Sequence, residues 1–161
     1  GFNGSISQLD LNFTANKFAI SGTTGSANQM VEQSVDNKVA SKWCLFHKNK
    51  VVTWQAEYDR PVGIISYEFI SGGDVPERDP KDWVLEASND GITWIPLDTK
   101  SNQSIFEKRL MKRSYELSEC SPEFKFYRFS FHKVHGNDMF QISEIKLNTT
   151  KTNRSFAAYP K

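Results

Sequence analysis

The segment Ser71–Lys81, SGGDVPERDPK, concentrates residue types that could bind a polar ligand. It contains three acidic and two basic side chains, two glycines and two prolines. Glycine permits close backbone approach and positive φ, whereas proline fixes φ, so the segment can form a rigid loop. Pre-ordered polar groups bind a hydroxyl-rich ligand at a lower entropic cost than mobile ones. The loop is therefore either a binding element or a surface connection braced by its own charges.

The central charges of this loop are Glu77, Arg78 and Asp79, and they allow two interpretations. Mutual ion pairs could hold them in place, with Arg78 bound to Asp79 or Asp74. Alternatively, the planar guanidinium could grip a ligand through several directed donors. The sequence leaves both interpretations of Arg78 open.

The common catalytic signatures are absent from the sequence. The three histidines, His47, His132 and His135, lack the spacing of an H-E-x-x-H metal site, and no C-x-x-C pair accompanies them. There is no G-x-S-x-G nucleophile elbow and no phosphate-binding glycine loop. Carboxylates are plentiful, but no pair stands in surroundings that would separate their pKa values. We therefore predict that the chain is not an enzyme.

Length and composition describe one ordinary globular domain. A chain of 161 residues can bury a core, and 24% charged residues is typical of such a domain. The aromatic share of 13% favours strands over helices. A net charge of +1 and the lack of a long apolar run predict no nucleic-acid partner and no membrane span. We expect a domain at 14–148, preceded by a loosely ordered segment at 1–13 and followed by a tail at 149–161.

Cysteines and glycosylation sequons bear on the compartment. Cys44 and Cys120 could pair, although free buried thiols are the favoured interpretation. An excess of N-x-S/T sequons is compatible with an extracellular protein or one in the secretory pathway. The five sequons begin at Asn3, Asn12, Asn102, Asn148 and Asn153.

Eight segments show the residue types and alternation of strands, whereas the one helical candidate, Asn28–Asp36, is too short for more than a turn or two. Turn residues stand between strands at Tyr58–Pro61 and Asn89–Gly91. The pattern predicts an all-β fold, a single eight-stranded β-sandwich of the jelly-roll type. The predicted strands are Asn16–Ser21, Val51–Tyr58, Val62–Ile70, Asp82–Ser88, Thr93–Leu97, Lys112–Ser118, Phe124–Phe131 and Gln141–Asn148.

Alternation within two of these strands assigns side chains to faces, because successive side chains of a strand point to opposite sides. In the strand at 124–131, Tyr127 and Phe129 should face the core. In the strand at 141–148, Ile145 and Leu147 should point inward and Glu144 outward.

Five motifs occur in an order that resembles a known family. Together they resemble the discoidin-like, or coagulation factor V/VIII type C, domains of the galactose-binding-like superfamily. The resemblance covers about residues 16–148 and is closest to the carbohydrate-binding modules of family 32 attached to glycoside hydrolases. The motifs are SVDNKVASKW (Ser34–Trp43), FHKN (Phe46–Asn49), SGGDVPERDPKDWVLEASNDGITWIPLD (Ser71–Asp98), FYRFSF (Phe126–Phe131) and FQISEIKL (Phe140–Leu147).

This resemblance implies a non-catalytic module that binds a glycan or glycoprotein through loops at one end. By position, Arg78 and His47 would grip the sugar, Asn137 would add a polar contact and Phe140 would stack on the ring. The predicted ligand-binding residues are thus His47, Glu77, Arg78, Asp79, Asn137 and Phe140.

The family often holds one structural Ca²⁺, an ion that prefers hard oxygen ligands. In this chain the loop would offer the carboxylate of Asp36, the hydroxyl of Ser41 and the carbonyls of Ser34 and Lys38, and Glu144 would close the site. The family usually has Asp-Gly where this chain has Asp36-Asn37, and asparagine also tolerates the left-handed conformation. The alternative is that Asp36-Asn37 forms a simple turn and that Glu144 is solvated.

Two other functions on the same scaffold stay open, because one fold hosts many partners. The first is a protein–protein interaction domain. The second is phospholipid binding, which needs exposed apolar spikes among lysines. Lys48 and Lys50 supply charge, but no pair of large apolar residues accompanies them, so this function ranks last.

Overall fold

The structure is a computed structural model that describes residues 17–150. The predicted loose segment at 1–13 and residues 151–161 of the predicted tail lie outside the described residues, as do the sequons at Asn3, Asn12 and Asn153. Residues 149 and 150 belong to the last strand, so the domain extends to Thr150 rather than ending at 148.

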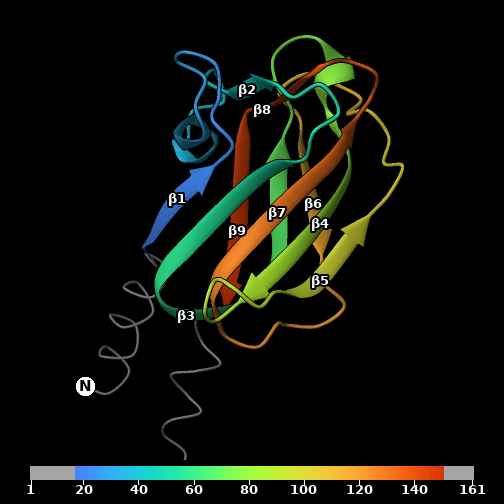
Figure 1. The fold of residues 1–161 in the computed structure, drawn as a ribbon. Helices are drawn as coiled ribbons and strands as arrows, with labels where there is room; N and C mark the ends of the chain where they lie inside the picture. The colour runs from blue at the N-terminus through green and yellow to red at the C-terminus, as the bar shows by residue number, and fades with distance from the viewer. Residues whose placement is uncertain (1–16, 151–161) are drawn as a thin grey trace, which may run out of the picture.

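Within residues 17–150 the chain forms nine strands and two short 3₁₀ helices, which confirms the predicted all-β sandwich (Figure 1). The nine strands differ from the predicted eight because two predictions merge, one divides and one strand was not predicted. The elements are β1 (Phe18–Gly22), η1 (Val31–Val35), β2 (Trp43–Phe46), β3 (Val52–Ile70), η2 (Pro76–Arg78), β4 (Pro80–Ser88), β5 (Ile95–Lys100), β6 (Lys112–Glu116), β7 (Phe124–Val134), β8 (Met139–Ile142) and β9 (Glu144–Thr150).

The long strand β3 belongs to both layers of the sandwich. Its first half lies between β1 and β7 in the sheet ordered β1-β3-β7-β4-β5. Its second half pairs with β6 on one side and β9 on the other. The two-stranded β2–β8 sheet covers one end of the sandwich, at the top of Figure 1, and β3 changes layer at the opposite end.

The predicted turn at Tyr58–Pro61 is wrong, because the backbone stays extended through these residues. The pairing register of β3 with β7 shifts between Glu57 and Val62, which marks a bulge at the corner. Proline has no N–H to give to a ladder, and a bulge is one of the few strand positions that tolerates it. One bent strand therefore replaces the predicted strands at 51–58 and 62–70.

The predicted strand at 141–148 divides at Ser143. The Ser143 N–H donates to the Ile70 carbonyl at 2.8 Å, and its hydroxyl donates to the Val39 carbonyl at 3.0 Å. These bonds separate β8 from β9. The strand β2 was not predicted because it is only four residues long.

Aromatic rings fill the core between the layers. Tyr127 and Phe129 are 0% exposed, as the alternation predicted, and Phe69 packs against Phe129 with ring centroids 5.2 Å apart. Full burial of one such ring contributes about 1.5–3 kcal/mol. The predicted Asn89–Gly91 turn is confirmed between β4 and β5, with Gly91 at φ +75°.

Ile145 and Leu147 point inward as predicted, and Glu144 lies on the opposite face of β9. The alternative that Glu144 is solvated is wrong, because its side chain is only 8% exposed. Both cysteines are free: Cys44 is buried, but Cys120 is exposed.

Candidate functional site

Three loops meet at the end of the sandwich where β2 and β8 lie (Figure 1). They are the β2–β3 loop (47–51), the β3–β4 loop (71–79) and the β7–β8 loop (135–138), which we call the ligand loops. The His47 N–H donates to the Asp138 carbonyl at 2.8 Å, and the His135 N–H donates to the Glu77 carbonyl at 3.0 Å. The β7–β8 loop is therefore bonded to both of the others.

The β3–β4 loop lies across the outer face of the β2–β8 sheet. In this sheet Trp43 and Leu45 face the core, so Cys44 and Phe46 face outward. Gln141 of β8 donates from its side-chain amide to the Asp74 carbonyl of the loop and accepts from Lys42 Nζ at 2.9 Å. Lys42 also pairs with the Asp74 carboxylate at 2.9 Å, which ties the loop to β2.

Asp79 anchors the base of the loop, and its partner is Arg109. The two guanidinium nitrogens reach the two Asp79 oxygens at 2.9 and 2.7 Å, and Asp79 also accepts the Phe106 N–H at 3.1 Å. Arg109 donates further to the carbonyls of Gly72 and Asp74, at 3.3 and 3.4 Å. The pairing with Asp79 raises the pKa of Arg109 above its usual value.

This geometry corrects two predictions. Asp79 is 0% exposed and its oxygens are occupied, so it cannot contact a ligand. The expected mutual ion pairs among Glu77, Arg78 and Asp79 are also absent among the described residues, because the buried carboxylate faces Arg109 instead.

Arg78 has no such partner. Its side chain is half-buried, one guanidinium nitrogen lies 4.0 Å from Cys44 Sγ, and Nε has no hydrogen-bond partner among the described residues. No carboxylate of residues 17–150 forms an ion pair with it. Its directed donors are therefore left for a ligand, and the alternative of an internal pair with Asp74 or Asp79 is wrong.

His47 and Asn137 stand in the neighbouring ligand loops. His47 is 6% exposed; its Nδ1 accepts the Asn49 N–H at 3.1 Å, while its Nε2 has no partner among the described residues. Asn137 accepts the Met139 N–H at 2.8 Å. It also lines an open hollow of about 210 Å³, together with Asn49 of the β2–β3 loop and the end of β7. Glu77 is exposed. The ligand loops thus contain five of the six predicted ligand residues, of which Asp79 is buried in its ion pair with Arg109.

Phe140 does not belong to this surface, which corrects the prediction that it stacks on a ligand. It is 0% exposed and packs at 5.1 Å from Trp43 and 4.8 Å from Phe131, measured between ring centroids. Phe46 is 60% exposed instead, beside His47 and on the same face of β2 as Cys44. The alternation in WCLF would have indicated this residue if β2 had been recognised.

The predicted calcium residues form a second polar cluster. The Asn37 N–H donates to Glu144 Oε1 at 3.2 Å, and the Ser41 hydroxyl donates to the Asp36 carboxylate. Glu144 Oε2 is buried without a hydrogen-bond partner among the described residues. Burial, together with the adjacent Asp36 carboxyl, raises the pKa of Glu144 to about 8. The structure therefore brings two carboxyl groups together in a poorly solvated place.

Comparisons with solved structures identify the fold. The module CpGH89CBM32-5 of Clostridium perfringens, solved in complex with GalNAc-β-1,3-galactose, superposes with a TM-score of 0.69 at 9% identity, covering 81% of this chain and 94% of that one. An F5/8 type C domain from Bacteroides fragilis superposes with a TM-score of 0.70 at 13% identity, covering 83% and 93%. The chain has the discoidin-like fold.

Further comparisons extend this result. The family 32 module of C. perfringens NanJ, in complex with galactose, has the same discoidin-like fold, with a TM-score of 0.66 at 9% identity over 81% of this chain and 92% of that one. In sequence, 105 residues are 37% identical to a peptide-N(4)-(N-acetyl-β-glucosaminyl)asparagine amidase from Arabidopsis thaliana. The match covers 65% of this chain but 14% of the amidase. No family model matches the sequence.

The resemblance seen in the sequence led us to expect a calcium ion, and the residues at Asp36 and Glu144 fit one in part. The orphaned Glu144 oxygen and the left-handed Asn37, at φ 61°, suit a turned loop around a hard cation. However, the Lys38 carbonyl already accepts two bonds from Ser41. No group of three His, Cys, Asp or Glu side chains gathers in the described part of the chain, so an ion would depend on backbone oxygens as well.

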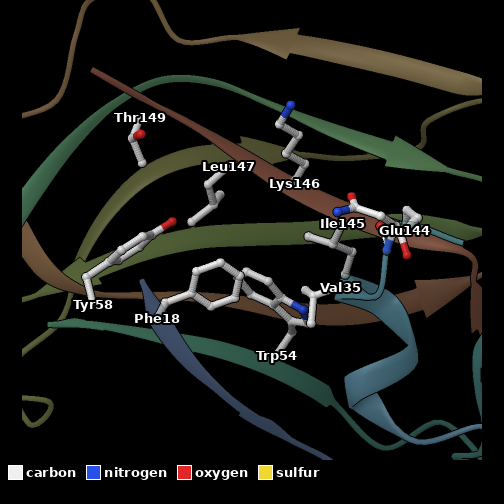
Figure 2. Close-up of a pocket in the computed structure, with 10 residues that line it drawn as sticks. Phe18, Val35, Trp54, Tyr58, Glu144, Ile145, Lys146, Leu147 and Thr149 are labelled. Carbon is white, nitrogen blue, oxygen red and sulfur yellow. Dashed lines mark hydrogen bonds between the residues drawn. The ribbon is translucent and has the colours of Figure 1, made fainter. Parts of the chain in front are cut away.

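A separate hollow of about 270 Å³ opens between β1 and β9. Figure 2 shows the rings of Phe18 and Trp54 side by side along it, with Tyr58 at one end and Glu144 at the other. None of its described lining residues belongs to the ligand loops. Elsewhere, no helix among residues 17–150 has the length and apolar character needed to cross a bilayer.

Proposed function

We propose that this chain is a non-catalytic carbohydrate-binding module that holds a glycan at the ligand loops. The observation that supports this most directly is the state of Arg78, whose half-buried guanidinium has no carboxylate partner among the described residues. An exposed aromatic ring, Phe46, stands on the same face of β2 as Cys44, the residue that Arg78 contacts. Sugar recognition requires this combination of directed donors and an apolar plane.

Each group would have a defined task. The planar guanidinium of Arg78 can donate to two neighbouring sugar hydroxyls, and the Phe46 ring can cover the apolar face of the pyranose. The orphaned Nε2 of His47 would add a donor or acceptor if the loop opens slightly. The Asp79–Arg109 brace keeps the loop in one conformation, so less entropy is lost on binding.

The named relatives support a particular class of ligand for this proposal. The named neighbours bind galactose and GalNAc-β-1,3-galactose, and the amidase is named for the GlcNAc–asparagine linkage of glycoproteins. The glycans of glycoproteins contain these sugars. We infer that the module recognises a glycoprotein glycan and that any catalysis resides in other parts of a longer protein.

A calcium ion is part of this proposal. Asp36 and Glu144 would hold it together with loop carbonyls, and it would supply two positive charges to neighbouring carboxylates. The residues themselves link the loop after η1 to β9, through the Asn37–Glu144 hydrogen bond.

Extracellular or secretory localisation also stays a proposal, with a direct test. Asn102 is exposed, whereas Asn148 donates from its side-chain amide to the Ser66 hydroxyl at 2.8 Å and is half-buried. In a chain that passes through the secretory pathway, we expect a glycan on Asn102 and little on Asn148. Mass spectrometry of secreted protein, with Asn102→Gln as control, would show this; an unmodified Asn102 would contradict it.

The central experiment is a glycan array, probed with and without chelator, followed by calorimetric titration of the best ligand. Binding that Arg78→Ala weakens would support the proposal. An array without any bound glycan would overturn it.

Phospholipid binding is a second candidate that one observation favours more than the sequence did. Phe46 and Val51, 60% and 46% exposed, flank Lys48 and Lys50. Vesicles with phosphatidylserine, compared with neutral vesicles, test this candidate; binding to the anionic vesicles alone would favour it.

A further inference from the structure

Four cations at the ligand-loop end of the sandwich lie outside any ion pair among the described residues. Lys48 and Lys50 are exposed in the β2–β3 loop, and Lys133 is exposed near the end of β7. None of them forms an ion pair with a described carboxylate, and neither does Arg78.

The acidic groups at this end do not cancel these charges. Asp74 and Asp79 are already paired with Lys42 and Arg109. Three carboxylates at this end lie outside any ion pair among the described residues: Glu77 and Asp138 of the ligand loops, both exposed, and the half-buried Asp82 of β4, which is opposite Lys133 in the strand register. The four unpaired cations therefore outnumber the unpaired anions by one.

One of these cations lines a hollow in which a ligand could sit. Lys133 lines the hollow of about 210 Å³ together with Asn49, which stands between Lys48 and Lys50, and with Asn137 and Asp138. This volume is below the roughly 300–1,000 Å³ of a pocket for a drug-sized ligand. It would accept one sugar ring and leave the remainder of a glycan outside.

A second, independent observation points to a ligand at the same end. His47 is 94% buried, by its 6% exposure, yet its Nε2 has no hydrogen-bond partner among the described residues. The buried Nε of Arg78 is likewise unpartnered. Buried polar groups are normally hydrogen-bonded, so unpaired ones at a loop surface indicate a missing partner.

We propose that the ligand loops select an acidic sugar, whose carboxylate is bound by Lys48, Lys50, Lys133 and Arg78 at the end of a glycan chain. This inference rests on the proposed function and adds to it the charge of the ligand. A carboxylate satisfies cationic donors through short, charge-assisted bonds, which neutral hydroxyls cannot match. Such a preference depends on salt, because dissolved ions weaken the attraction between exposed charges. The screening length is about 10 Å at 0.1 M ionic strength.

The experiment compares acidic sugars with neutral ones of the same ring stereochemistry. Methyl galacturonoside is titrated against methyl galactoside, and methyl glucuronoside against methyl glucoside, at low and high salt. In at least one pair we expect the acidic member to bind about tenfold more tightly or better at low salt, as one charge-assisted bond allows. The ratio should shrink as salt rises.

Two variants locate the effect. In the triple variant Lys48→Gln/Lys50→Gln/Lys133→Gln the acidic preference should fall several-fold or more, while affinity for the neutral sugar is unchanged. The matched control is Lys125→Gln, because Lys125 lies near the start of β7 and Lys133 near its end. The control should keep the full preference, and melting curves should show that both variants are folded.

The outcomes separate this inference from the proposed function. Neutral and acidic members that bind equally in every pair would overturn the acidic preference and leave glycan binding intact. An acidic preference that is unchanged in the triple variant would also overturn this inference, because other residues would then bind the carboxylate. Failure of every sugar, here and on the array, would overturn both proposals, and binding to phosphatidylserine vesicles alone would assign the cations to a lipid surface.

Discussion

Arg78 belongs to the β3–β4 loop, whereas Arg109 contacts that loop from the segment between β5 and β6, and the surroundings of the two arginines are opposite. Arg109 makes two bonds to a carboxylate that is 0% exposed and three to backbone carbonyls. Arg78 has one weak contact with a sulfur atom and an unpartnered Nε. A polar group with every bond made maintains the loop, whereas one with bonds unmade is available to a ligand. The loop is thus supported by an arginine of another segment, and its own arginine is the group that the proposed function assigns to a ligand.

We expect the largest effect from the removal of Arg109, the residue that supports the β3–β4 loop. Arg109→Ala leaves the Asp79 carboxylate buried without its charge partner, and removal of one member of a buried pair costs about 3–5 kcal/mol. Chemical denaturation should show this loss. Arg78→Ala serves as the matched control and should change the free energy of unfolding by less than about 1 kcal/mol. Equal losses in the two variants would erase the distinction between the arginines.

The second prediction applies the same contrast to the carboxyl group of Glu144. Glu144 is a buried group with an unmade bond, as Arg78 is, so a calcium ion should stabilise the fold by mass action. The gain is about 2.7 kcal/mol when the free ion stands at about 100 times Kd. Chelation should lower the Tm, and in Asp36→Ala that shift should vanish. An identical melting curve with and without chelator, and no metal by elemental analysis, would argue against the ion.

The third prediction tests the proposed contact between Arg78 and a glycan. Arg78→Ala should weaken glycan binding by about 1.5–3 kcal/mol, the range for hydrogen bonds to charged groups. Arg78→Lys should not restore affinity, because an ammonium cannot reproduce a planar fork. Calorimetry on the three proteins, with melting curves alongside, provides the measurement. Equal affinities would place the binding face elsewhere.

The smallest effect concerns the aromatic ring. Phe46→Ala should weaken binding by about 0.5–1.5 kcal/mol through lost ring contacts. Phe18→Ala removes another partly exposed ring, 40% exposed on β1, and should leave affinity unchanged. If both variants bind like wild type, Phe46 is not a platform.

The parts of the molecule that sequence could predict are those set by local pattern. The alternation of Tyr127 and Phe129 placed the core face, and Asn89–Gly91 placed a hairpin turn, since both depend on neighbours in the chain. The partner of Asp79 lies 30 residues away, in a segment without a recognisable pattern. The sequence therefore left the role of Arg78 open between brace and ligand contact, and only the folded topology brings Arg109 to the bracing position.

The error at Phe140 has a similar origin. Without the β2–β8 pairing, the phenylalanine before the last strand could have faced either way. The pairing of Leu45 with Phe140 puts both on the inner face, and the exposed ring is then Phe46, paired with Met139. A four-residue strand has too little alternation to be read reliably, although it decides which aromatic side chain is exposed.

The corner of β3 has a consequence for how such a domain is carried by a larger protein. Phe18 pairs with Tyr58 and Thr150 pairs with Gly63, so the described chain enters and leaves beside the same bend. Domains whose ends lie close together can be inserted into a surface loop of a host without rerouting it. At the strand rise, the first half of β3 separates this attachment corner from the ligand loops by on the order of 20 Å. A host protein attached at this corner would leave the ligand loops, at the opposite end of the sandwich, exposed to solvent.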